Sequence, residues 1–132
     1  MKLLQPAEWL PPKGYANGIS AKGTLVFVGG QIGWNGQQQF ASDDFIAQTR
    51  QALINVVAVL REANARPEHM VRMTWYIVDR DEYVLRLKEL GAVYREIIGR
   101  NFPTMSCVEV SRLVEVRAKV EIEVTAVVPD II

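Results

Sequence analysis

The segment from Ala118 to Val128 alternates apolar and polar residues with the two-residue period of a β-strand. Its apolar positions are Val120, Ile122, Val124 and Ala126, and its polar positions are Glu121, Glu123 and Thr125. Such a strand buries one face only, so it belongs to a sheet that is covered on one side. In a monomer the polar face of this strand would turn to water.

Two other segments repeat apolar residues at helical spacing and can cover the buried face of that sheet. The first begins at Ser42-Asp43-Asp44, where a hydroxyl can cap free N–H groups and two acids lie near the positive end of the helix dipole. It should fade near Asn64-Ala65, before Pro67. The second can be capped by Asp79 or Asp81 and should stop at Gly99. Its inward positions are Tyr83, Leu87, Leu90, Tyr94, Ile97 and Ile98.

Four further segments favour strands, at 15–20, 24–28, 70–78 and 105–110. The order of elements predicts an α+β fold, with two helices on one face of a sheet. Three prolines make residues 1–13 an extended lead-in. We expect residues 1–132 to form a single domain, because single domains commonly hold on the order of 100–150 residues.

Composition disfavours several classes of function. Apolar residues make up 49% of the chain, enough for a packed core. Fifteen basic residues balance fifteen acidic ones, so there is no excess positive charge to attract nucleic acid. Low net charge also leaves self-association unopposed. Val108, Val110, Val127 and Val128 could form a second contact surface, so we expect an oligomer.

The chain offers no signal for export or for a membrane. Its start has no uninterrupted apolar run of the length that a secretory signal needs, and no window approaches roughly 18 apolar residues. The single cysteine, Cys107, cannot form an intrachain disulfide. We therefore expect a cytoplasmic protein. The single histidine, His69, has no neighbour at metal-ligand spacing, so we expect no metal site.

Six segments, in order, resemble the RidA/YjgF family of reactive-intermediate deaminases, also labelled endoribonuclease L-PSP. They are Gly14–Gly18, Val28–Ile32, Gln48–Val56, Val71–Tyr76, Phe102–Leu113 and Lys119–Glu123. The resemblance implies a chorismate-mutase-like fold with one mixed sheet, assembled as a homotrimer. It also implies small-molecule clefts between subunits and no cofactor.

The same resemblance implies residues for the hydrolysis of an imine or enamine. Glu121 matches the glutamate that helps to hold the attacking water, and Tyr15 matches a tyrosine that lines the cleft. Backbone groups around Cys107 would position the substrate. Gly29 matches the position before the family's Gly-Gln pair, which is Gly30-Gln31 in this chain. A carboxylate near an electrophilic carbon can orient water and relay its proton.

Three residues depart from the family pattern. Met105 stands where relatives have an arginine that grips the substrate carboxylate, Gly29 where many have serine, and Gly91 where many have asparagine. Methionine has no charge and no donor. Losing a charged contact to a buried anion costs on the order of 2–5 kcal/mol, or roughly thirty- to several-thousand-fold in selection of a 2-imino acid. Arg112 or Arg117 is a conceivable substitute.

Several of these residues also have simple structural interpretations. Glu121 on an alternating strand can be a solvated acid. Cys107 in an apolar strand can be an inert, buried thiol rather than a nucleophile. Tyr15 can be a half-buried aromatic residue at a strand end, and Trp75 can be core.

These observations leave three functional hypotheses. The first is a RidA-like trimer that hydrolyses an imine, enamine or related electrophile, with a specificity that Met105 has altered. The second is a trimer that binds a metabolite or a partner protein without catalysis. The third is a ribonuclease, which the balanced charge and the lack of a histidine pair disfavour most.

Overall fold

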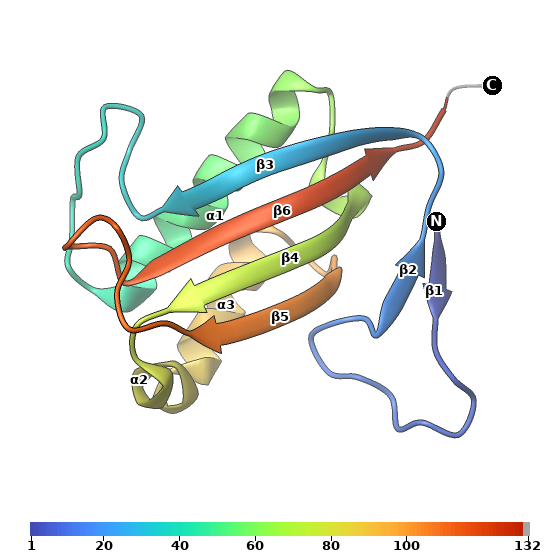
Figure 1. The fold of residues 1–132 in the computed structure, drawn as a ribbon, viewed down its shortest axis with the longest axis horizontal. Helices are drawn as coiled ribbons and strands as arrows, with labels where there is room; N and C mark the ends of the chain where they lie inside the picture. The colour runs from blue at the N-terminus through green and yellow to red at the C-terminus, as the bar shows by residue number, and fades with distance from the viewer. Residues whose placement is uncertain (131–132) are drawn as a thin grey trace.

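We describe the chain from a computed structural model, which places residues 1–130. Its elements, in chain order, are β1 (Lys2–Leu4), β2 (Gly18–Ser20), β3 (Thr24–Ile32), α1 (Phe45–Glu62), a 3₁₀ turn (Pro67–His69), β4 (Met70–Ile77), α2 (Arg80–Leu85), α3 (Leu87–Ile97), β5 (Thr104–Glu109) and β6 (Val120–Val128). Figure 1 shows four of the strands side by side in one twisted sheet, with the β1–β2 ribbon beyond one end of it.

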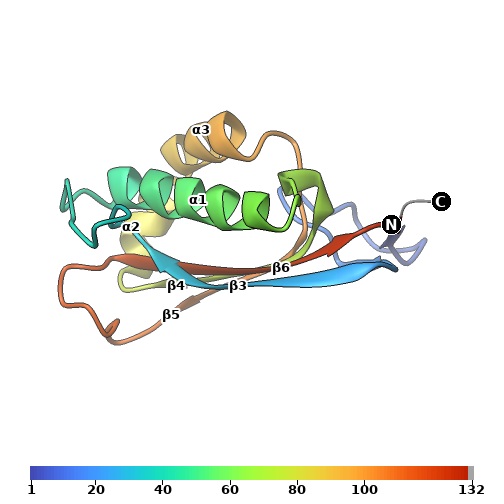
Figure 2. The same ribbon diagram turned by 90° about the horizontal axis from the view of Figure 1, so that it is seen from above.

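The main sheet has the strand order β3-β6-β4-β5 and is mixed. Strands β4 and β5 run parallel, whereas β6 runs antiparallel to both of its neighbours. Viewed along the sheet, α1 and α3 lie on the same face, and no helix covers the other face within residues 1–130 (Figure 2). This arrangement confirms the predicted α+β fold with helices on one side of a sheet.

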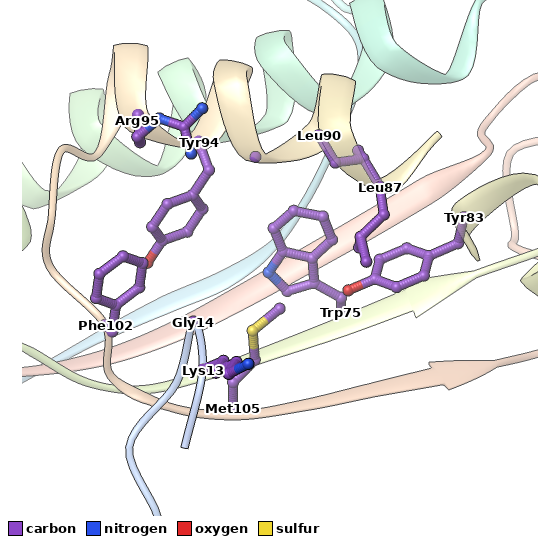
Figure 3. A pocket seen from close by; sticks show the side chains of 11 residues that line it. Lys13, Gly14, Trp75, Tyr83, Leu87, Leu90, Tyr94, Arg95, Phe102 and Met105 are labelled. Carbon is purple, nitrogen blue, oxygen red and sulfur yellow. The ribbon is translucent and has the colours of Figure 1, made fainter. Parts of the chain in front are cut away.

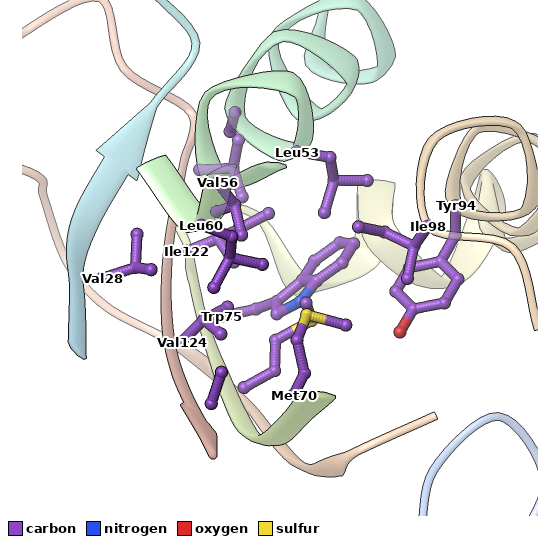
Figure 4. Close-up of a cluster of buried hydrophobic side chains, with 14 of the residues drawn as sticks. Val28, Leu53, Val56, Leu60, Met70, Trp75, Tyr94, Ile98, Ile122 and Val124 are labelled. Atoms are coloured by element: carbon purple, nitrogen blue, oxygen red, sulfur yellow. The ribbon is translucent and has the colours of Figure 1, made fainter. Parts of the chain in front are cut away.

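The core lies between the helices and the sheet, as the alternation in the last strand predicts. The apolar positions of β6 are all buried, and they face Leu53, Val56 and Leu60 of α1 (Figure 4). A buried aliphatic side chain contributes about 1.5–3 kcal/mol relative to an exposed one. This burial fixes the register of β6, because a shift by one residue would turn Glu121 and Glu123 into the core.

A buried glutamine anchors the start of β6. Gln48 of α1 is 1% exposed; its Nε2 donates to the carbonyl oxygens of Ser42 and Arg117, and its Oε1 accepts from the Lys119 backbone N–H at 2.9 Å. Asn55, two turns further along α1, donates to the carbonyl oxygens of Ile32 and Trp34 at the end of β3. These bonds hold the two strands that carry Gly30 and Glu121.

The helix boundaries differ from the prediction in two places. Asp44, not Ser42, caps α1, since its side chain accepts from the Ala47 N–H at 3.0 Å while Ser42 Oγ accepts from the Asp44 N–H. The second predicted helix is two helices, α2 and α3, which meet at Arg86. Because of this break Leu87 leaves the inward stripe and is 53% exposed. The predicted cap at Asp79 and the stop at Gly99, with φ of 77°, are confirmed.

The N-terminal region is also more structured than predicted. Within residues 1–13, Lys2–Leu4 form β1, which pairs antiparallel with β2. The predicted strand at 15–20 is shorter, because only Gly18–Ser20 are extended and paired. Asn17 lies before this strand, and its Nδ2 donates to Gln5 Oε1 at 2.7 Å.

The uncovered face of the sheet carries both charged and large apolar side chains. Phe27 and Leu25 of β3 are 71% and 58% exposed, and Val108 of β5 is exposed as well. Between them, Tyr76 donates its hydroxyl hydrogen to Glu123 Oε1 at 2.8 Å. In residues 1–130 no helix is long and apolar enough to cross a membrane.

Candidate active site

A pocket of about 380 Å³ opens between α3 and the edge strand β5, on the helix side of the sheet. This size is at the lower end of the roughly 300–1,000 Å³ of small-molecule sites. Met105 enters it from β5 (Figure 3). Gly91 of α3 forms part of its wall. The remaining lining residues are Lys13, Gly14, Trp75, Tyr83, Leu87, Leu90, Tyr94, Arg95 and Phe102.

Aromatic side chains form most of the walls of this pocket. Tyr94 and Phe102 stack with ring centroids 5.7 Å apart, and Trp75 meets Tyr83 edge to face at 6.4 Å. The Tyr94 hydroxyl donates to the Asn101 carbonyl oxygen at 2.5 Å, which fixes the ring. Burial raises the pKa of Tyr94 above its ordinary value. The interior is therefore apolar, rigid and uncharged near neutral pH.

Cys107 lies two residues after Met105 on β5, on the same face of the strand and beside Tyr83. Burial raises the pKa of the Cys107 thiol, and the nearby Tyr83 hydroxyl lowers it only in part. Burial, together with the neighbouring Cys107, raises the pKa of Tyr83 to about 12. Both groups keep their protons at neutral pH, so Cys107 is not an activated nucleophile.

Two cationic side chains lie at the rim. Arg95 follows Gly91 by one helical turn, and its Nη1 is 3.5 Å from the point where a β carbon at residue 91 would lie. Lys13 reaches the rim from the N-terminal segment. Neither forms an ion pair within the described chain, 1–130. The rim can therefore attract an anion, although Met105 inside the pocket cannot.

Tyr15 and Met105 both line a second hollow at the edge strand β5. The chain segment before β2 joins the edge of the sheet at β5. The Ala16 N–H donates to the Pro103 carbonyl oxygen at 3.0 Å, and Ala16 forms a parallel bridge with Thr104. A smaller, polar depression of about 210 Å³ results, lined by Tyr15, Ala16, Asn17, Arg72, Thr104, Met105 and Ser106. Met105 thus lies between two hollows.

Glu121 and Gly30 form a second group, on the uncovered face of the sheet. The strand β3 has a bulge between Val28 and Gln31, which contains Gly29 and Gly30. The Glu121 carboxylate occupies the space over Gly30, where a β carbon would lie 2.3 Å from Oε2. The bulge also shows that the glycines belong to a strand rather than to a phosphate-binding loop.

The predicted site residues therefore fall into two groups within one chain. Met105, Gly91, Tyr15 and Cys107 gather around β5, whereas Glu121 lies with Gly29 and Gly30 near β3. Strand β4 separates the groups, and they lie on opposite faces of the sheet, since Glu121 pairs with Tyr76 while Met105 pairs with the buried Met73. One chain alone does not bring Met105 and Glu121 into a common site.

Neither arginine named as a substitute for the family arginine lies at Met105. Arg117 bonds Asp43 at 2.8 Å and its guanidinium stacks on Phe40, while Arg112 lines a different hollow near the start of β6. Arg95, which the sequence pattern did not single out, lines the pocket that Met105 enters, and Arg72 lines the smaller hollow with Met105. The spacing of four residues between Gly91 and Arg95 is the signal that would have pointed to Arg95. Trp75 is core, as predicted, and it lines the pocket as well.

Comparisons with known proteins agree with this architecture. The family model described as Endoribonuclease L-PSP matches residues 7–128. A RutC family protein of Synechocystis is 34% identical over 132 residues, covering 98% of each chain. A Salmonella typhimurium protein named 2-iminobutanoate/2-iminopropanoate deaminase is 33% identical over 113 residues, covering 86% of each.

The fold is shared with solved structures as well. The crystal structure of a Rid family protein of unknown function from Yersinia pestis superposes with a TM-score of 0.85 at 27% identity, covering 96% of this chain and 98% of the other. The match to the family model covers most of the chain, and relatives and structures agree with it. The protein belongs to the Endoribonuclease L-PSP family, that is, the RidA/YjgF family.

Proposed function

We propose that this protein hydrolyses an imine or enamine that carries an apolar group where relatives bind a carboxylate. The observation that carries the proposal is the apolar, aromatic pocket around Met105 and Gly91. The relative named 2-iminobutanoate/2-iminopropanoate deaminase supports the reaction class. The uncharged interior supports the change in substrate, because methionine is an adaptable apolar wall and not an anion receptor.

The catalytic carboxylate would come from a neighbouring copy. Because Glu121 and Met105 lie on opposite faces of one sheet, a complete site requires that a second chain place its Glu121 and Gly30 beside the first chain's pocket. The uncovered face supports this assembly, since Phe27, Leu25 and Val108 expose apolar surface there. We infer a chorismate-mutase-like homotrimer, which closes three equivalent contacts by rotation.

Each group then has a defined part in the reaction. Glu121 accepts a hydrogen bond from water and takes its proton while the water oxygen bonds to the C=N carbon. Glu121 returns that proton to the nitrogen, which gives an amino alcohol. Glu121 then relays the hydroxyl proton to the same nitrogen, so that the C–N bond breaks, ammonia leaves and a carbonyl product remains. The aromatic walls hold the substituent and keep bulk water away from the reacting carbon. The reaction uses one water and releases one ammonia, so it consumes no cofactor.

Ammonia release from freshly generated imines tests this proposal. We expect turnover of imines with phenyl or long alkyl substituents, and a loss of at least about a hundredfold in Glu121→Gln, as for removal of a general base. Glu123→Gln is the matched control, because Glu123 lies on the same face and strand but bonds Tyr76. Equal rates in Glu121→Gln and wild type would contradict the proposed role of Glu121.

A second candidate function is binding without catalysis. The pocket itself favours it, because its tyrosines keep their protons at neutral pH and no carboxylate or histidine of residues 1–130 lines it. A ligand that raises the melting temperature while every imine remains intact would support this function over hydrolysis.

A further inference from the structure

The indole nitrogen of Trp75 is a buried hydrogen-bond donor with no partner among residues 1–130. Trp75 is 2% exposed, so water does not satisfy the group either. Buried polar groups in native proteins nearly always have a partner, and an exception requires a reason. The partner that is missing from the chain can come from a ligand.

The position of this donor indicates where such a ligand lies. Trp75 lines the pocket beside Met105, and in Figure 3 its nitrogen is on the side of the ring that faces Gly14 and Phe102, away from Tyr83. In Figure 3 the Met105 side chain lies on that side, and its thioether is at most a weak acceptor. The nitrogen makes no polar contact in the described part of the fold and is covered, so a ligand in the pocket meets it when the flexible Met105 side chain moves aside.

The remaining walls define the shape of the ligand. Tyr94 and Phe102 stack almost in parallel, at 8°, and both line the cavity. Gly91, one turn before Tyr94 on α3, adds room because it has no side chain where the helix passes the pocket. Flat aromatic surfaces around a narrow cavity favour a planar ring over a branched alkyl group.

We propose that Trp75 is a specificity-determining residue, whose Nε1–H binds a neutral oxygen or nitrogen acceptor on an aromatic ligand held in this pocket. The inference deepens the proposed function, because it names the substrate class as aryl imines and their carbonyl products. The carbonyl or imine group accepts from Trp75, the ring lies against Tyr94 and Phe102, and Met105 closes the apolar side. Arg95 stays at the rim, outside this contact.

Nuclear magnetic resonance of the indole N–H groups tests the contact directly. The chain has three tryptophans, and Trp75→Phe identifies the signal of Trp75. We expect benzamide, which has a ring and a neutral acceptor, to shift that signal downfield. Ethylbenzene, which has the ring but no acceptor, should bind without that shift. A Trp75 signal that benzamide leaves unmoved would overturn the proposal.

Affinities give an independent measure. In Trp75→Phe the preference for benzamide over ethylbenzene should fall about two- to tenfold, the value of one neutral hydrogen bond. Phenylalanine has a smaller ring than tryptophan and packs less against either ligand. The ratio of the two affinities cancels this loss. An unchanged ratio would contradict the role of the N–H group. If benzoate binds more than about tenfold tighter than benzamide, the site recognises an anion, and the proposal of a neutral ligand is wrong.

Gly91→Met provides a second variant that leaves the core and Trp75 intact. A side chain at residue 91 meets only Arg95 Nη1, at ordinary contact distance, and methionine favours a helix more than glycine does. It should fill the pocket and weaken both ring ligands at least about tenfold. Benzamide binding that survives this change would place the ligand elsewhere and overturn the proposal.

These outcomes separate the inference from the proposed reaction. Benzamide binding with the Trp75 shift, but without turnover of any imine, would refute hydrolysis and leave the ligand class standing. Turnover of aryl imines without the Trp75 shift would support hydrolysis and refute the contact between the ligand and Trp75.

Discussion

The carboxylate of Glu121 lies directly over Gly30, so that a β carbon at residue 30 would come within 2.3 Å of Oε2. Gly30 lies in the bulge of β3, beside the strand β6 that carries Glu121. The glycine thus sets the position of the one carboxylate that the proposed mechanism uses.

Gly30→Ala should therefore impair activity more than stability. The added methyl group displaces the Glu121 side chain, and a misplacement of about 1 Å can cost about a hundredfold in rate. The free energy of unfolding should change by less than about 1 kcal/mol, because the side chain of Glu121 can swing away. Imine hydrolysis and thermal unfolding measure the two effects. Gly36→Ala is the control, since a β carbon at residue 36 meets nothing within 4 Å. Full activity in Gly30→Ala would remove Glu121 from its assigned place.

Met105→Arg should increase hydrolysis of 2-iminopropanoate. A guanidinium restores the planar fork that matches a carboxylate, and a contact of this kind is worth about 2–5 kcal/mol when it is desolvated. We expect a gain of at least about tenfold in kcat/KM, with a loss for aryl imines. Arg95→Gln is the informative comparison: if wild type already hydrolyses 2-iminopropanoate well and Arg95→Gln does not, the rim arginine replaces the family arginine.

Cys107 should behave as a passive thiol. Burial raises its pKa above the ordinary value, so the reactive thiolate is scarce at neutral pH and increases only as the pH rises past that value. Iodoacetamide at pH 8 should alkylate the native protein at least about tenfold more slowly than free cysteine. Cys107→Ala should keep its rate within about threefold of wild type, or about 0.6 kcal/mol. Inactivation by that substitution would assign the thiol a chemical role.

Asp44 should make stability depend on acid pH. The hydrogen bond from Arg86, reinforced by the Ala47 N–H, lowers the pKa of Asp44 below its ordinary value of 3.8. A carboxyl whose pKa is lower in the folded state stabilises the fold above its unfolded pKa, and this contribution is lost as the pH falls through the folded value. Between pH 5 and pH 2, the free energy of unfolding, measured with urea, should therefore fall more steeply with decreasing pH in wild type than in Asp44→Asn. Identical pH profiles would refute the linkage.

Gln48→Leu should destabilise the protein by about 2–4 kcal/mol, because it leaves two carbonyl oxygens and the Lys119 N–H without partners in a buried site. Gln51→Leu, one turn away on α1, removes a single bond to Asn55 and should cost less than about 1 kcal/mol. Chemical denaturation of both variants measures the difference. Equal costs would show that the anchor at the start of β6 contributes little.

The periodic parts of the fold were predictable from the sequence. Alternation in Val120–Val128 and helical spacing in Phe45–Glu62 reflect burial on one face, which a sequence records directly. The break between α2 and α3 at Arg86 was not predictable. Arg86 bonds Asp44, Glu82 and Glu89 at once, and Asp44 caps α1, which is distant in the chain. The strand β1 was missed for a similar reason, since three residues carry too little pattern without the partner β2.

The candidate site shows the same division. The resemblance to the family identified Met105, Gly91 and Glu121, and the structure places the first two in one pocket. It could not indicate that Glu121 lies on the other face, which follows from the register of β6 with β4. The free donor of Trp75 was equally hidden, because a buried tryptophan in a strand has the same sequence pattern whether or not its nitrogen is bonded.

The most direct test of a site shared between copies is complementation. Glu121→Gln removes the carboxylate and Gly91→Met fills the pocket, so each variant alone should be inactive on aryl imines. When the two are unfolded, mixed in equal amounts and refolded together, sites that combine an open pocket with an intact Glu121 from the next copy should restore about one quarter of wild-type activity. A mixture that remains as inactive as its parents, although mixed oligomers have formed, would show that one chain contains the whole site.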